Sequence, residues 1–164
     1  MHLPALSPTW LAHIPLDWIF IIVFALLLSF DAMRSGSGRA SVLAIAFPIA
    51  AFLSGLMPRT FIVGNAMASF STPVLKTAIF LFTFGIAYLL IYRIVYSFGA
   101  ASRGFLFSLL AGISATIVTV VMWLQVPALA GVWHFGTQVQ SVFGAAYALL
   151  WIVGAYLILA FVRS

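Results

Sequence analysis

The sequence of 164 residues contains no cysteine and no glutamate, and its only acidic residues are Asp17 and Asp31. Without cysteine, the chain has no disulfide, no thiolate nucleophile and no cysteine-ligated metal centre. The two aspartates lie fourteen residues apart on one expected helix, or about 21 Å, which is too far for an acid–base pair. No serine stands in a nucleophile-elbow context, and no carboxylate is placed to orient a histidine. We therefore predict a protein that is not an enzyme and that holds no cofactor or metal.

Charge of either sign is scarce. Only 5% of the residues are charged and 65% are hydrophobic, with a mean hydropathy of +1.26, whereas roughly a quarter of a soluble protein is charged. The apolar residues form runs near the roughly 20 residues of a membrane-spanning helix, and they do not alternate as barrel strands do. The sequence predicts an all-α, polytopic transmembrane helical bundle that forms one domain over residues 1–164 in a lipid bilayer.

Five apolar runs are predicted to span the membrane, over residues 16–33, 40–57, 74–96, 104–126 and 141–162. Residues 1–15 are expected to form an interfacial segment. Residues 60–73 are too short to cross and return, so they are an amphipathic surface segment or a re-entrant piece. Pro48 is expected to kink the second span, and residues 127–140 are expected to form a loop. The last run could instead be peripheral, which leaves a four-span alternative.

The seven lysine and arginine residues give a formal net charge of +5 and stand singly at the ends of the apolar runs. This scatter differs from the continuous basic patch of a nucleic-acid-binding protein, so no nucleic-acid partner is expected. In the five-span topology, one side of the membrane carries Arg34, Arg39, Arg93, Arg103 and Arg163, and the other carries Arg59 and Lys76. The positive-inside rule then places the N-terminus outside and the C-terminus in the cytoplasm.

The two aspartates are expected to have structural roles. Asp31 lies near the C-terminal end of the first span, where the helix dipole disfavours negative charge. Arg34 or Arg39 must therefore offset it, and an interfacial ion pair is favoured over a proton relay or substrate site. Asp17 lies at the opposite end of the same span, where it meets the positive pole of the dipole and can cap amide groups.

Three histidines, His2, His13 and His134, fall on the outer side in the five-span topology. Converging imidazoles could bind a metal ion, but their spacing matches no ligand signature. Trp10 and Trp133 lie close to them in the sequence. Interfacial histidines in an aromatic belt are therefore the favoured interpretation.

Small residues recur every four positions in the fourth span, at Gly104, Ser108, Gly112 and Thr116. Small side chains at this spacing let another helix approach closely. We expect this stripe to serve packing within the chain, with homo-oligomerisation as the alternative. A less regular series in the last run pairs Ser141 with Ala145 and Gly144 with Ala148.

The arrangement resembles the CvpA (colicin V production protein) family of bacterial inner-membrane proteins. The resemblance covers about residues 16–126 and rests on three features: the entry Leu16, Asp17 and Trp18, the glycine- and arginine-containing turn 34–39, and Arg103 followed by Gly104, Ser108 and Gly112. It implies a location in the inner membrane and no established catalytic residues. It also implies a link to export of a peptide toxin and to envelope maintenance.

Three functions follow as hypotheses. The first is a non-enzymatic, CvpA-like inner-membrane protein that assembles with itself or with other membrane subunits. The second is a small structural subunit of a larger membrane complex. The third is an oligomeric channel or transporter with a path lined by Thr77, Thr83, Thr116, Thr119 and Gln125. No span carries a charged residue at its centre, where transporters usually place theirs, and this disfavours the third hypothesis.

Overall fold

The structure is a computed structural model that describes residues 15–57, 72–96 and 104–163. These residues form the helices α1 (Leu16–Ser35), α2 (Gly38–Leu56), α4 (Pro73–Tyr96), α5 (Gly104–Gln125), α6 (Pro127–Ala130), α7 (Thr137–Phe143) and α8 (Ala148–Arg163). Four of them are long and apolar enough to cross a membrane, and α7 with α8 makes a fifth if the bent pair is one span. The predicted all-α, transmembrane-type bundle is confirmed.

The four long helices begin and end within two residues of the predicted bounds. Local signals in the sequence mark several of these ends. Between α1 and α2, Gly36 adopts a φ of 84°, a left-handed conformation that favours glycine. Pro73 is the first residue of α4, where a missing N–H costs no helical hydrogen bond. Pro127 follows α5 and begins α6. The helix α2 continues unbroken through Pro48.

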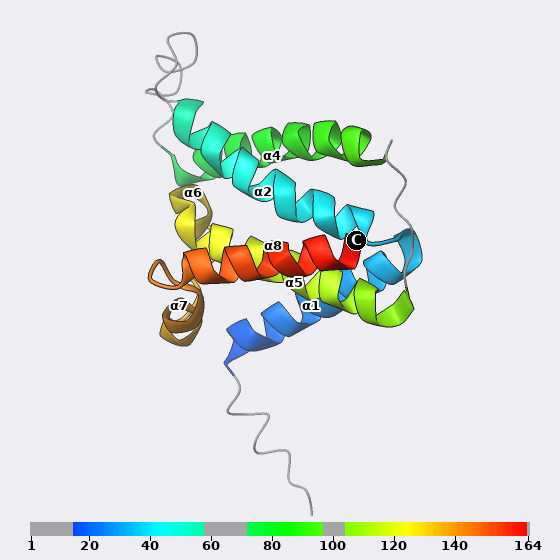
Figure 1. The fold of residues 1–164 in the computed structure, drawn as a ribbon. Helices are drawn as coiled ribbons and strands as arrows, with labels where there is room; N and C mark the ends of the chain where they lie inside the picture. The colour runs from blue at the N-terminus through cyan, green and yellow to red at the C-terminus, as the bar shows by residue number, and fades with distance from the viewer. Residues whose placement is uncertain (1–14, 58–71, 97–103, 164) are drawn as a thin grey trace, which may run out of the picture.

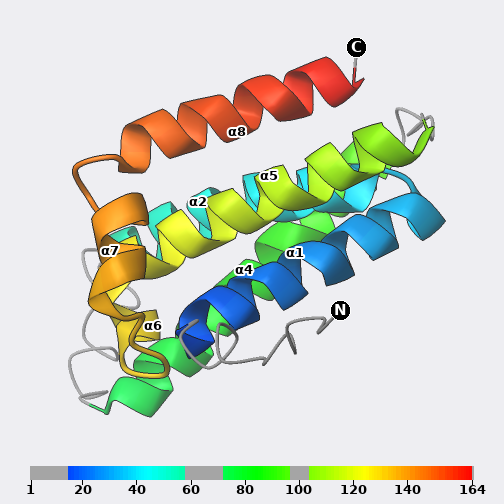
Figure 2. The same ribbon diagram turned by 90° about the horizontal axis from the view of Figure 1, so that it is seen from below.

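Helix α5 is the centre of the bundle. It packs against α1, α2 and α8, while α4 packs on the outer side of α2 (Figure 1). Figure 2 shows α8 on one side of α5 and α1 on the other. In the most apolar 18-residue stretch of each helix, the buried share is 56% for α5 but only 17% for α1. In a bilayer, the exposed apolar faces of α1 and α4 are the surfaces that meet lipid.

The chain passes back and forth between two ends of the bundle (Figure 1). At one end, here called the turn end, lie the α1–α2 turn, the start of α5 and the last residue of α8. At the other, here called the cap end, lie the start of α1, the end of α2, α6 and α7. Arg34, Arg39 and Arg93 are at the turn end and Lys76 is at the cap end. Arg59 and Arg103 lie outside the described residues.

The last predicted span is not one continuous helix. Instead of a single helix over 141–162, α7 and α8 meet at an angle of 66°. Gly144 between them is extended, with ψ near 179°, and its amide donates to the carbonyl of Gln140 at 2.8 Å. A Cβ at Gly144 would collide with that carbonyl oxygen. The prediction that Ser141 and Ala145, and Gly144 and Ala148, share one helix face is therefore wrong. The break lies between the two members of each pair.

Two further predictions fall almost wholly outside the described residues. The interfacial segment 1–15, with His2 and His13, is described only at Pro15. The surface or re-entrant segment 60–73 is described only at its last two residues. The predicted loop 127–140 is described, and it contains α6 and most of α7.

Candidate functional site: the capped end of the bundle

Residues 127–143, comprising α6, its connecting loop and α7, lie across the cap end of the bundle (Figure 1) and are here called the end cap. Its apolar side chains Phe135, Val139 and Phe143 are buried in a cluster with Ile21 of α1 and Val121 of α5. The polar residues of α7 are exposed, namely Thr137, Gln138, Gln140 and Ser141. This amphipathic pattern fits a helix that lies over the bundle rather than one that crosses the membrane.

Asp17 anchors the end cap to α1. Its Oδ2 accepts a hydrogen bond from the amide of Gly136 at 2.6 Å, and its Oδ1 accepts one from Nε1 of Trp133 at 3.3 Å. Asp17 is in the first turn of α1, and Gly136 is the N-cap residue of α7. Two helix N-termini therefore face one carboxylate, which their dipoles stabilise. A Cβ at Gly136 would lie only 2.9 Å from Oδ2, so glycine admits the carboxylate here.

Other helices hold the same segment. On the α6 side, Oγ1 of Thr77 in α4 donates to the carbonyl of Ala128 at 2.6 Å. On the α7 side, Nε1 of Trp151 in α8 donates to the carbonyl of Val142 at 2.7 Å. The ring of Phe20 in α1 stacks on that of Trp133 with centroids 6.0 Å apart. The end cap is therefore fixed by side chains from α1, α4 and α8.

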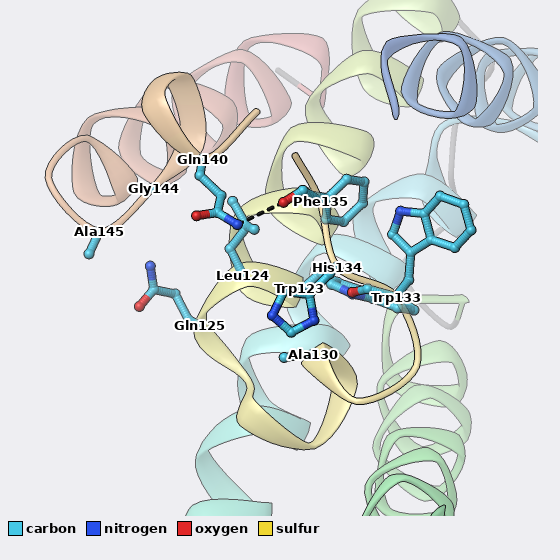
Figure 3. A pocket seen from close by; sticks show the side chains of 10 residues that line it. All are labelled: Trp123, Leu124, Gln125, Ala130, Trp133, His134, Phe135, Gln140, Gly144 and Ala145. Atoms are coloured by element: carbon cyan, nitrogen blue, oxygen red, sulfur yellow. Dashed lines mark hydrogen bonds between the residues drawn. The ribbon is translucent and has the colours of Figure 1, made fainter. Parts of the chain in front are cut away.

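A cavity of about 330 Å³ lies between the end of α5, the end cap and the helix break (Figure 3). It is lined by Trp123, Leu124, Gln125, Ala130, Trp133, His134, Phe135, Gln140, Gly144 and Ala145. Figure 3 shows the side chains of Gln125, His134 and Gln140 around the opening, while the indole of Trp133 is turned to one side. These lining residues include no aspartate, glutamate, lysine or arginine.

The predicted ion pair lies at the turn end. Nη1 of Arg39 is 3.2 Å from Oδ1 of Asp31, and both side chains are nearly half exposed. Oγ of Ser35 donates to the same oxygen at 3.4 Å. Tyr92 of α4 is a further polar neighbour of Arg39. Arg34 is exposed, and no described side chain pairs with it. Of the two partners predicted for Asp31, the structure therefore shows Arg39.

Replacing Asp31 by asparagine is expected to change stability only slightly, because exposed ion pairs contribute little. The effect should depend on Arg39. In a double-mutant cycle of thermal unfolding in detergent, Asp31→Asn should have less effect when Arg39→Gln is already present, but an unchanged effect beside Arg34→Gln. Additive effects with Arg39→Gln would contradict the pairing. A loss of function at normal membrane levels would assign Asp31 a chemical role.

The small-residue stripe lies mainly against α1. Ser108, Gly112 and Thr116 are buried in α5. Gly112 faces Ser29 of α1 so closely that a Cβ would collide with the Ser29 backbone. Gly104 takes no part, because it is exposed at the first residue of α5 with a φ of 57°.

Hydroxyl groups reinforce this contact in both directions. Oγ of Ser108 donates to the carbonyl of Ala32 at 3.4 Å, and Oγ of Ser29 donates to the carbonyl of Leu109 at 3.3 Å. Such polar links across close helices are typical of membrane bundles. The structure therefore places Ser108 and Gly112 at a contact within one chain.

The threonines considered for a polar path have backbone partners instead. Thr83, Thr116 and Thr119 each donate to the carbonyl four residues earlier in the same helix, at 2.9, 2.9 and 2.8 Å. This bond satisfies a hydroxyl inside a helix bundle. Among the residues considered for the path, only Gln125 lines the cavity.

The sequence did not indicate the end cap as a site. Gln140 and the backbone of Gly136 were assigned to a loop, and Asp17 was expected to cap its own helix. One available signal was the run Thr137–Phe143, which places polar and apolar residues on opposite faces of a short helix. The partners of Asp17 lie 116 and 119 residues away, and one sequence gives no sign of that contact.

The described part of the chain brings no three histidine or carboxylate side chains together in a way that could hold a metal ion. The groups that line the cavity beside the end cap are the amides of Gln125 and Gln140, the imidazole of His134 and the indoles of Trp123 and Trp133. In comparisons with known proteins, no family model, no curated protein and no solved structure matches this chain.

Proposed function

We propose that this chain is a non-enzymatic, multi-pass protein of the bacterial inner membrane, similar to the CvpA family. It acts in toxin or peptide export or in envelope maintenance by assembling with itself or with other membrane subunits. The proposal rests on the positions of the charged side chains and of the buried hydroxyl groups. Described charged side chains lie near the helix ends, whereas buried hydroxyls such as those of Ser108 and Thr77 bind carbonyls of other helices.

Each segment that carries the family resemblance contains a residue that contacts another helix, which supports the proposal. In the entry to α1, Asp17 binds the end cap and the ring of Trp18 lies 6.1 Å from that of Phe143. In the α1–α2 turn, Arg39 pairs with Asp31. In α5, Gly112 contacts α1. The resemblance therefore includes Asp17, Arg39 and Gly112, which lie at contacts between helices.

The proposal includes an orientation. Four of the described basic residues, Arg34, Arg39, Arg93 and Arg163, lie at the turn end, and Lys76 lies at the cap end. Under the positive-inside rule, the turn end is cytoplasmic, and the start of α1 and the end cap face outward. This arrangement places the cavity on the outer side of the membrane.

The proposed function can be tested by complementation in a bacterial strain that lacks its CvpA-family protein. Expression of this chain should restore secretion of a peptide toxin that depends on that protein. Gln138→Ala, an exposed change on α7, should restore it as well, because it leaves the end cap intact. No restoration at equal membrane levels would contradict the proposal. Stable co-purification as a subunit of an energy-converting complex would favour the structural-subunit hypothesis instead.

A further inference from the structure

The cavity at the cap end is built by two helix interruptions that the sequence specifies. Pro127 lies just beyond α5 and begins α6, and Gly144 separates α7 from α8. Because a Cβ at Gly144 would strike the carbonyl oxygen of Gln140, the break needs a glycine. In membrane proteins, irregular backbone is tolerated where it is buried in protein or lines a water-filled cavity. Discontinuous helices also line the binding sites of many transporters.

Three polar side chains line this cavity beside its tryptophans, those of Gln125, His134 and Gln140. Nε2 of Gln140 donates to the carbonyl of Phe135 at 2.7 Å, which orients the amide while its Oε1 can still accept a hydrogen bond. The side chains of Gln125 and His134 make no hydrogen bond with another described residue. Donors and acceptors are thus available around the same opening (Figure 3).

The apolar part of the wall is held in place. Nε1 of Trp123 donates to the carbonyl of Trp133 at 3.2 Å. The ring of Trp123 also meets that of Phe135 edge to face, with centroids 6.3 Å apart. A fixed aromatic wall beside a few polar groups is the usual composition of a small-molecule site. The volume of about 330 Å³ is near the lower end of the range for such sites.

The composition of the cavity lining disfavours the binding of ions. Its described lining has no lysine or arginine to bind a phosphate or carboxylate, and no carboxylate to bind a cation. Asp17 already binds the adjoining loop at Trp133 and Gly136, and its negative charge disfavours an anion nearby.

We propose that this cavity binds an uncharged polyhydroxyl group of about the size of one sugar. The hydroxyls hydrogen-bond to Gln125, His134 and Gln140, and the C–H face of the ring lies against the aromatic wall. A free sugar and the headgroup of a glycolipid share this chemistry. The site is independent of the function proposed above, because it rests on the cavity alone.

The natural absence of cysteine allows a direct test by site-specific labelling. Ala145 lines the cavity and is exposed, so Ala145→Cys in the full chain can report occupancy through its rate of reaction with a maleimide. Gln138→Cys, exposed on α7 but outside the lining, is the matched control. Free glucose is added to the protein in nanodiscs of phosphatidylcholine. A second set of nanodiscs contains monoglucosyl diacylglycerol and no free sugar.

Glucose in either form should slow the labelling of Ala145→Cys several-fold and leave Gln138→Cys unchanged. An effect of the free sugar identifies a soluble ligand, and an effect of the glycolipid alone identifies a headgroup. Adding Gln125→Ala should weaken the apparent affinity roughly fivefold, the equivalent of one hydrogen bond. No slowing in either arm would overturn the proposal, and so would equal slowing of Gln138→Cys or equal protection by glucose 6-phosphate.

Discussion

Replacing Gly112 by alanine is expected to destabilise the bundle by about 1–3 kcal/mol or more, the usual cost of overpacking a core. The added Cβ would collide with the backbone of Ser29, so α1 and α5 would have to separate. Helix propensity alone predicts the opposite sign, because alanine is favoured over glycine by about 1 kcal/mol. Thermal unfolding in detergent, followed by circular dichroism, measures the difference.

The matched control is Gly85→Ala in α4, where a Cβ would meet nothing within 4 Å. This variant should be as stable as the parent or slightly more stable. Equal losses at Gly112 and Gly85 would contradict the close contact. If Gly112→Ala lost its oligomeric state but kept its fold, the contact would lie between chains and not within one chain.

Replacing Asp17 by alanine is expected to release the end cap. The change removes the acceptor of the Gly136 amide and of the Trp133 indole. Hydrogen bonds to charged groups contribute about 1.5–3 kcal/mol, and partial exposure here reduces the expected loss to about 1–2 kcal/mol. Hydrogen exchange measured by mass spectrometry should show faster exchange in residues 127–143, with α5 protected as in the parent.

Asp17→Asn is the informative companion, because an amide keeps one acceptor oxygen but loses the second. Exchange in the end cap should then lie between that of the parent and that of Asp17→Ala. Unchanged exchange in both variants would show that the apolar contacts of Phe135 and Val139 hold the end cap without the carboxylate.

The four long helices could be predicted from the sequence because their determinants are local. Apolar runs, the glycine turn around Gly36 and the prolines at 73 and 127 mark their bounds without reference to the rest of the chain. The contact face of α5 was also predictable, since the small residues at 108 and 112 repeat at helical spacing. That spacing could not show that the partner was α1, nor that Gly104 lay outside the contact.

The end cap could not be predicted because its determinants are distant in sequence. The Gly136 amide and the Trp133 indole that bind Asp17 lie more than a hundred residues away. The break at Gly144 follows from one extended residue inside a run that is otherwise apolar enough to span. Composition favours a continuous helix there, but Phe143, the last residue of the end cap, packs in a cluster with Ile21 and Val121, and this long-range contact is not visible in the sequence.

In the proposed topology, the chain crosses the membrane an odd number of times between the α1–α2 turn and the end cap, and the end cap lies outside. Single cysteines at Gln138 and Ser35, both exposed and at opposite ends, test it in intact cells with a membrane-impermeant maleimide. We expect Gln138→Cys to be labelled at once and Ser35→Cys only after the inner membrane is permeabilised. Labelling of both in intact cells, or of Ser35→Cys alone, would contradict the account.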